Sequence, residues 1–249
     1  MMAQESENVL LRLGNLAMKN SKWADYANYC FDRAKGLRKS ALKHIDRFCE
    51  STSTWTLDDK IDFVKFVLPI DEQDTNSKLL PFSLLEHLIR PTLVSWCDIE
   101  QVDNNPFRWL GLYYGGSLMY NASVDKPYEP REKNLLKAIE LDPTDDLARV
   151  GLIEPWAEHI WFAVHHLPEY YIGNPPDDIK TCEKINEQIQ QLTKPELREY
   201  WTGRVERSQE LVRNYFEWKV SQHPDFKQWG QENNKETNSY VPTYYYHQR

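Results

Sequence analysis

The sequence predicts an all-α protein in which antiparallel helix pairs stack like structural repeats, without a significant β-sheet. Three observations support this fold class. Glycine is scarce, at 9 of 249 residues, and leucine, glutamate and lysine outnumber valine and threonine, which favours helix over strand. Apolar residues recur at helical spacing through most of the chain. The clearest stretch, 105–143, places small residues where two helices would touch and ends at Asp142-Pro143.

The first half of the chain is predicted to contain a series of short helices. Asp58 and Asp59 suit the positive end of one of them, and Pro91 suits the first turn of another. A polar loop is expected over 69–78. The expected helices, each with an apolar stripe, cover residues 7–18, 23–49 (as one helix or two), 57–68, 82–89 and 91–96.

The second half continues the helical pattern. Pro155 is expected to kink a helix or start a new one, and Thr193 is expected to cap the long helix that begins near Pro195. After residue 223 no apolar stripe is evident. A repeat-like helix pair is expected over 106–141, with its turn over 117–131, and further helices are expected over residues 145–154, 156–167, 177–191 and 195–222.

These elements predict one helical repeat-like domain over 1–223 and a polar, aromatic-containing tail over 224–249. Tyr240 and the run Tyr244–Tyr246 are unusual in a polar tail, so we expect them to dock on the helical body or on a partner. If any strand exists, 241–246 is the best place for it.

The stretch 105–143 resembles the tetratricopeptide repeat. Phe107, Leu110-Gly111 and Tyr114 match its first helix, and Leu135, Ala138 and Pro143 match its second. Two departures are evident: Arg131 stands where a small alanine is usual, and the turn between the helices is longer by about eight residues. The resemblance implies a stack of helix pairs whose concave face holds a peptide or protein partner.

A second, fainter copy of the same pattern lies near the N-terminus. Leu10, Leu13-Gly14 and Ala17 echo the first helix, and Ala27, Phe31 and Ala34 echo the second, but no proline follows. Any antiparallel helix pair needs small residues at its crossing and a stop at its end, so a simple helix pair is the alternative interpretation.

Charge and cysteine content limit the class of protein. The net charge of −8 disfavours a general nucleic-acid binder and favours a basic partner. The basic segment Arg33–Arg47 is interpreted as a solvated helix face, with RNA binding as the weaker alternative. Four widely spaced cysteines without a Cys-x-x-Cys pair predict free thiols. No signal-peptide core or membrane-spanning stretch is evident, so we expect a cytoplasmic protein.

The candidate site residues are histidines and aromatics. Glu154, Glu158, His159, His165 and His166 could act as acid and base, but His159 and His166 are two turns apart, roughly 10.5 Å along a helix, so we expect neither a metal nor a cofactor. Trp109 and Tyr113 either line a ligand groove or pack against preceding helices. The residues predicted to bind a partner are Trp109, Tyr113, Tyr120, Tyr128, His159 and His166.

Two functions from different classes follow. The first is a non-catalytic protein–protein interaction module that neutralises or escorts a basic protein, as immunity proteins and chaperones do. The alternative is a helical enzyme or metal-binding protein centred on Glu158, His159, His165 and His166. The sequence leaves the oligomeric state open.

Overall fold

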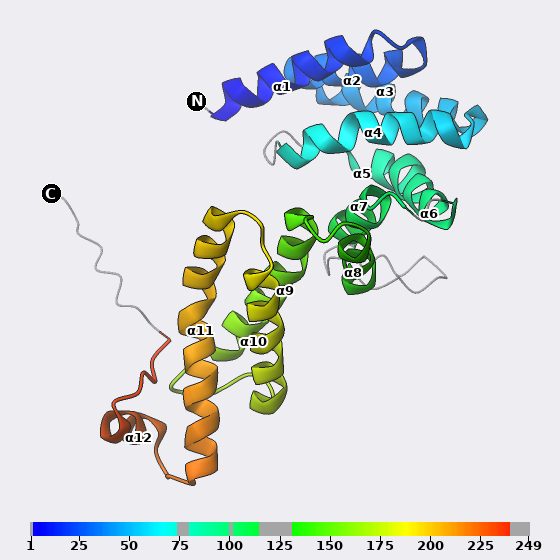
Figure 1. Ribbon diagram of the computed structural model, residues 1–249. Helices are drawn as coiled ribbons and strands as arrows, with labels where there is room; N and C mark the ends of the chain where they lie inside the picture. The colour runs from blue at the N-terminus through cyan, green and yellow to red at the C-terminus, as the bar shows by residue number, and fades with distance from the viewer. Residues whose placement is uncertain (1, 74–79, 100–101, 115–130, 240–249) are drawn as a thin grey trace, which may run out of the picture. The chain divides into compact units, whose positions relative to one another are not determined.

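The computed structural model describes residues 2–73, 80–99, 102–114 and 131–239 (Figure 1). Every regular element in these residues is helical, which confirms the all-α fold class. By their internal contacts the residues form two compact units, Met1–Tyr128 and Glu129–Arg249. The single domain over 1–223 and the stacking of helix pairs as repeats stay predictions. None of the helices in the described part of the chain is long and apolar enough to cross a membrane.

The first unit begins with three helices, each of which packs against the next one in the chain. Its elements are α1 (Met2–Ala17), η1 (Ser21–Trp23), α2 (Ala24–Ala34), α3 (Arg38–Ser51), η2 (Thr52–Thr54), α4 (Leu57–Gln73), α5 (Phe82–Leu84), η3 (Leu85–Ile89), α6 (Arg90–Ile99) and α7 (Asn105–Tyr114).

Glycine positions shape the first three helices. A Cβ atom added to Gly14 would lie 2.7 Å from the ring of Phe31, so only glycine allows α1 and α2 to approach this closely. Gly36 has φ +74° and separates α2 from α3, because a left-handed residue ends a helix. The stretch 23–49 is therefore not one helix but the end of η1 followed by α2 and α3.

Of the two prolines in the helices of the first unit, one contradicts its predicted place and the other agrees with it. Helix α4 runs through Pro69 to Gln73, so the polar loop predicted from residue 69 does not begin there. Pro91 lies in the first turn of α6, as predicted, and the π-helical turn η3, which ends two residues before this proline, joins α5 to α6 without a break. A π-helical turn changes the hydrogen-bonding pattern locally, which accommodates a residue that lacks an N–H group.

The core of the first unit is rich in aromatic rings. Phe63 is fully buried and contacts Tyr26 edge to face at 5.0 Å between ring centroids. Phe48 lies 4.8 Å from Phe63, and Trp23 stacks on Phe66 at 4.7 Å. Such ring pairs add stabilisation beyond their apolar area, so aromatic packing joins α2, α3 and α4.

The second unit is built around three packed helices. Helix α9 packs against both α10 and α11, and α10 packs against α11. The unit's elements are α8 (Arg131–Leu141), α9 (Asp146–Val164), α10 (Pro175–Gln190), α11 (Pro195–Ser221) and α12 (Phe226–Asn233).

The start of α11 is held by a carboxylate from α9. Asp146, only 6% exposed, accepts hydrogen bonds from the backbone N–H groups of Thr193 (2.7 Å) and Lys194 (3.1 Å) and from the Thr193 hydroxyl (2.7 Å). Burial raises the pKa of Asp146, but these hydrogen bonds together lower it by more, so the pKa lies below its usual value. The expected cap by Thr193 is therefore wrong: its side chain donates to Asp146 instead.

A helix and an ordered segment follow residue 223, where the sequence showed no apolar stripe. Helix α12 buries Phe226 and Trp229 against the second core. A Cβ atom added to Gly230 would overlap the side chain of Thr237, so the chain returns directly over this helix. The expected tail over 224–249 thus begins with packed structure, and the possible strand over 241–246 lies outside the described residues.

Candidate interaction surface

Five side chains at the end of α9 form a continuous set of ring contacts. Their ring centroids are 5.0 Å apart for Trp161 and His165, 4.9 Å for Phe162 and His165, 3.9 Å for His165 and His166, and 4.4 Å for His166 and Tyr170. Three of the five are strongly exposed: Trp161 at 58%, Phe162 at 51% and Tyr170 at 51%. We call Trp161, Phe162, His165, His166 and Tyr170 the ring array.

The helical period of α9 explains why this surface is exposed. Ile160, Ala163 and Val164 lie on the opposite side of the helix and are buried in the second core. The exposed positions Trp161 and Phe162 therefore face away from α10 and α11. Because Nδ1 of His165 donates to the carbonyl oxygen of Phe162 at 2.6 Å, the central ring of the array has a fixed orientation.

Two carboxylates lie on the same face of α9 as the rings. Glu154 and Glu158 are exposed, and Glu158 precedes Trp161 and Phe162 by three and four residues, the spacing of neighbours on one helix surface. Arg131 at the start of α8 lies 3.9 Å from Glu154. Burial lowers the pKa of Arg131, and the nearby Glu154 and Glu158 oppose that shift. The surface thus combines aromatic rings with acidic groups.

His159 has a different setting from the two histidines of the ring array. Its Nε2 donates to Oδ1 of Asp178 at 2.8 Å, and the Asp178 side chain is only 4% exposed. The hydroxyl of Tyr171 donates to the other carboxylate oxygen at 2.6 Å. Burial, together with the adjacent carboxylate, raises the pKa of Tyr171. Asp178 therefore orients His159 toward α10.

The structure brings together only some of the predicted site residues. Helix α9 ends at Val164, so His166 leaves the helix and stacks on Tyr170 rather than sharing a face with His159. Within the described residues, no group of three or more His, Cys, Asp or Glu side chains could hold a metal ion. The histidines therefore divide between an oriented His159–Asp178 pair and the ring array.

The predicted aromatic residues of the first unit are packed. Trp109 is 3% exposed and lies 6.0 Å from Trp96 between ring centroids. Tyr113 packs, partly buried, against the same core. Tyr120 and Tyr128 lie outside the described residues. Of the two interpretations of Trp109 and Tyr113, the one in which they pack against preceding helices agrees with these positions.

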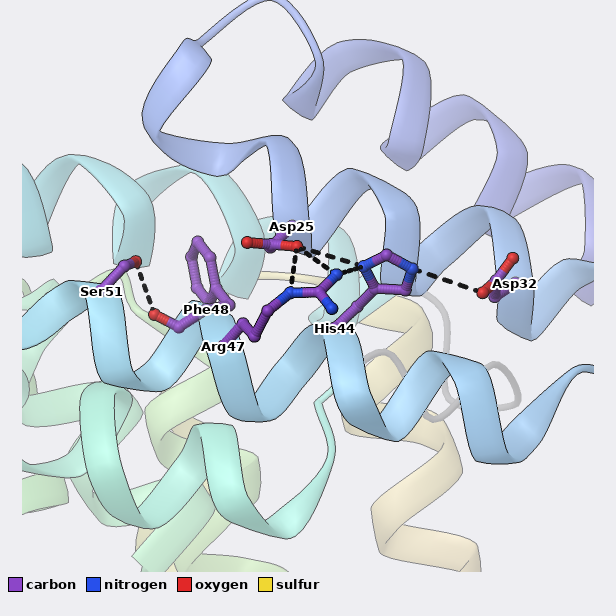
Figure 2. Close-up of polar contacts among 6 residues, drawn as sticks. All are labelled: Asp25, Asp32, His44, Arg47, Phe48 and Ser51. Carbon is purple, nitrogen blue, oxygen red and sulfur yellow. Dashed lines mark hydrogen bonds and ion pairs between the residues drawn. The ribbon is translucent and has the colours of Figure 1, made fainter.

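The basic segment is partly neutralised by the preceding helix (Figure 2). His44 lies between two carboxylates, with Nδ1 3.1 Å from Asp25 and Nε2 3.5 Å from Asp32. Arg47 donates to Asp25 at 2.9 Å. Burial raises the pKa of Asp25, but the hydrogen bonds from His44 and Arg47 lower it overall. Two of the basic residues thus join α2 to α3 rather than forming part of an uninterrupted cationic face.

Sequence reasoning missed Trp161, Phe162 and Tyr170. The signal available was the strongly apolar stretch 156–167, in which every turn of the helix carries large apolar residues. A helix that packs on one side cannot bury such residues on all faces, so some of them had to be exposed.

Comparison with protein-family models, curated proteins and solved structures gives no match for this chain.

Proposed function

We propose that this protein is a non-catalytic protein–protein interaction module that binds a basic protein partner through the ring array. The observation that carries the proposal is the exposure of Trp161, Phe162 and Tyr170 as one set of ring contacts, flanked by the acidic groups of α9. Neutralising or escorting such a partner, as immunity proteins and chaperones do, is the biological role proposed.

The chemistry of the surface favours cationic ligands. Tryptophan and tyrosine are enriched among the residues that dominate binding energy at protein interfaces. Their ring faces attract arginine and lysine side chains, an interaction that strengthens when water is excluded. Glu158 on the same helix face would pair with further basic groups. The net charge of −8 would speed the encounter with a basic partner.

The packing of α1 against α2 supports the proposal that the protein is a helical-repeat-like scaffold. Gly14 lies against the ring of Phe31, at the positions where the resemblance to the tetratricopeptide repeat aligns a small residue with an aromatic one. This close approach is what the repeat pattern requires of its two helices. A helical-repeat-like scaffold for partner binding is therefore part of the proposed function.

Affinity capture with matched variants tests the proposal. The full chain is used as bait in three forms: unchanged, with Trp161→Ala and Phe162→Ala together, and with Phe82→Ala. Phe82 is 54% exposed in the first unit and so serves as a matched exposed ring outside the array. Circular dichroism of all three forms verifies that folding is preserved.

We expect the unchanged chain and Phe82→Ala to recover the same dominant basic protein and the double variant to lose it. Each aromatic that anchors an interface contributes about 2 kcal/mol, or roughly thirtyfold in Kd. Retention should also fall with added salt because exposed charges are screened. Equal recovery by the double variant would contradict the proposal.

A further inference from the structure

The described part of the chain ends directly beside the ring array. Ser239 donates its backbone N–H to the carbonyl of Leu167 at 3.2 Å, and its hydroxyl lies 2.8 Å from the carbonyl of His165 and 3.0 Å from that of Leu167. These carbonyls follow the end of α9, where backbone oxygens have no partner within the helix. Ser239 thus satisfies the end of the helix that carries the array.

The residues before Ser239 are also held in place. The side-chain amide of Asn214 donates to the carbonyl of Glu236 at 2.9 Å, and Arg207 donates to the carbonyl of Asn238 at 3.0 Å. Both donors come from α11. The chain is therefore guided along α11 to α9, and its direction at residue 239 is set by several independent contacts.

We propose that the segment 240–249 binds back onto the ring array as an intramolecular ligand. Its sequence is Tyr-Val-Pro-Thr-Tyr-Tyr-Tyr-His-Gln-Arg, which supplies four tyrosines, a histidine and an arginine. Tyrosine rings pair favourably with exposed aromatic rings, and Arg249 is a cation suited to an aromatic surface beside the exposed Glu158. The segment lies outside the described residues, and its chemistry matches the surface at which the described chain ends.

The reach of the chain is sufficient. Five residues beyond Ser239 span at most roughly 17 Å when extended, and successive contacting rings of the array are 3.9 to 5.0 Å apart. The run Tyr244–Tyr246 can therefore contact any ring of the array. A short tether also gives an effective concentration on the order of millimolar, so contacts too weak to retain a free peptide suffice here.

The proposal has a regulatory consequence, which rests on the proposed function. A partner that binds the ring array would have to displace 240–249, so partner binding would be weakened by the segment and strengthened by its release. Docking of the segment itself requires no partner.

Photo-crosslinking of the full chain tests the docking. Tyr245 is replaced by the photoreactive residue p-benzoylphenylalanine, and the dilute protein is irradiated without any partner. The cross-linked monomer is digested and analysed by mass spectrometry. We expect the labelled peptide to be joined to the peptide that contains residues 161–170.

Two further variants carry the same label and serve as controls. Trp161→Ala with Phe162→Ala should lose most of this product, whereas Phe82→Ala, which removes an equally exposed ring elsewhere, should retain it. Cross-links to other parts of the chain, products formed only between copies, or equal yields from both variants would overturn the proposal. Those outcomes would leave the partner-capture result unaffected, so the two proposals fail separately.

Discussion

Single side chains decide how the ends of helices are held in this protein. Asp146 at the start of α9 satisfies the first N–H groups beyond Leu192, although the sequence pointed to Thr193 as the cap. Sequence reasoning found the correct place, a helix start near Pro195, but not the carboxylate that serves it. That carboxylate comes from 47 residues earlier in the chain, and no local pattern reveals such a pairing.

Replacing Asp146→Asn should lower the free energy of unfolding by about 2 kcal/mol, because hydrogen bonds to a buried charged acceptor are strong. The folded-state pKa of Asp146 is lowered, so its contribution is complete above the unfolded pKa of about 3.9. It is lost as pH falls through the lower folded pKa. Urea unfolding at neutral pH and at acid pH measures both effects.

The matched control is Asp177→Asn in the first turn of α10. The Asp177 side chain is 64% exposed, so we expect a loss of at most about 0.5 kcal/mol at neutral pH. Equal losses in the two variants, or a loss for Asp146→Asn that persists unchanged at acid pH, would contradict the role of the buried carboxylate.

Helical elements were predicted more successfully than their boundaries. The apolar periodicity located most helices correctly, including α8 and α11, because burial of one face imposes a helical spacing. The boundary at Pro69 was predicted wrongly because α4 continues through this proline to Gln73, whereas Pro91 lies in the first turn of α6, as predicted. Helix α12 was missed because Phe226 and Trp229 are the two large apolar side chains that it buries, too few for a periodic signal.

The closest helix crossing gives a test at the scale of elements. Gly14→Ala should destabilise the protein by roughly 1 kcal/mol, because the added Cβ meets the ring of Phe31 at 2.7 Å and overpacking outweighs the gain in helix propensity. Thermal unfolding measures the change.

Gly203→Ala in α11 is the matched control for this test. No atom lies within 4 Å of an added Cβ there, so the helix propensity of alanine should raise stability by up to about 1 kcal/mol. A stabilising effect of both substitutions would show that α1 and α2 do not cross at Gly14 as described.

At the scale of the whole molecule, the described residues form two hydrophobic clusters without a residue in common. One includes Phe63 and Val64, and the other includes Ile185 and Val212. The all-α fold class could be predicted from composition, because scarce glycine and abundant leucine favour helix throughout the chain. The division into two units did not follow, since it depends on which helices pack together, and long-range packing leaves little trace in local periodicity.

Paired core substitutions test this organisation. Val212→Ala and Val64→Ala each remove fully buried methyl groups and should cost roughly 1–3 kcal/mol. We expect Val212→Ala to accelerate amide hydrogen exchange within 131–239 and Val64→Ala within 9–113. Equal acceleration across both ranges in either variant would show that the two clusters unfold as one cooperative unit.

The hydrogen bonds of Ser239 have a consequence for the order of folding. They connect residues 72 and 74 positions apart, so their formation closes a long loop, whereas α9, α10 and α11 meet through short connections. Loop closure of this length is entropically costly, and contacts between distant residues form late. We therefore expect the carbonyl groups at the end of α9 to stay hydrated until the last stage of folding, and Ser239 to be among the first residues released when the native protein opens locally.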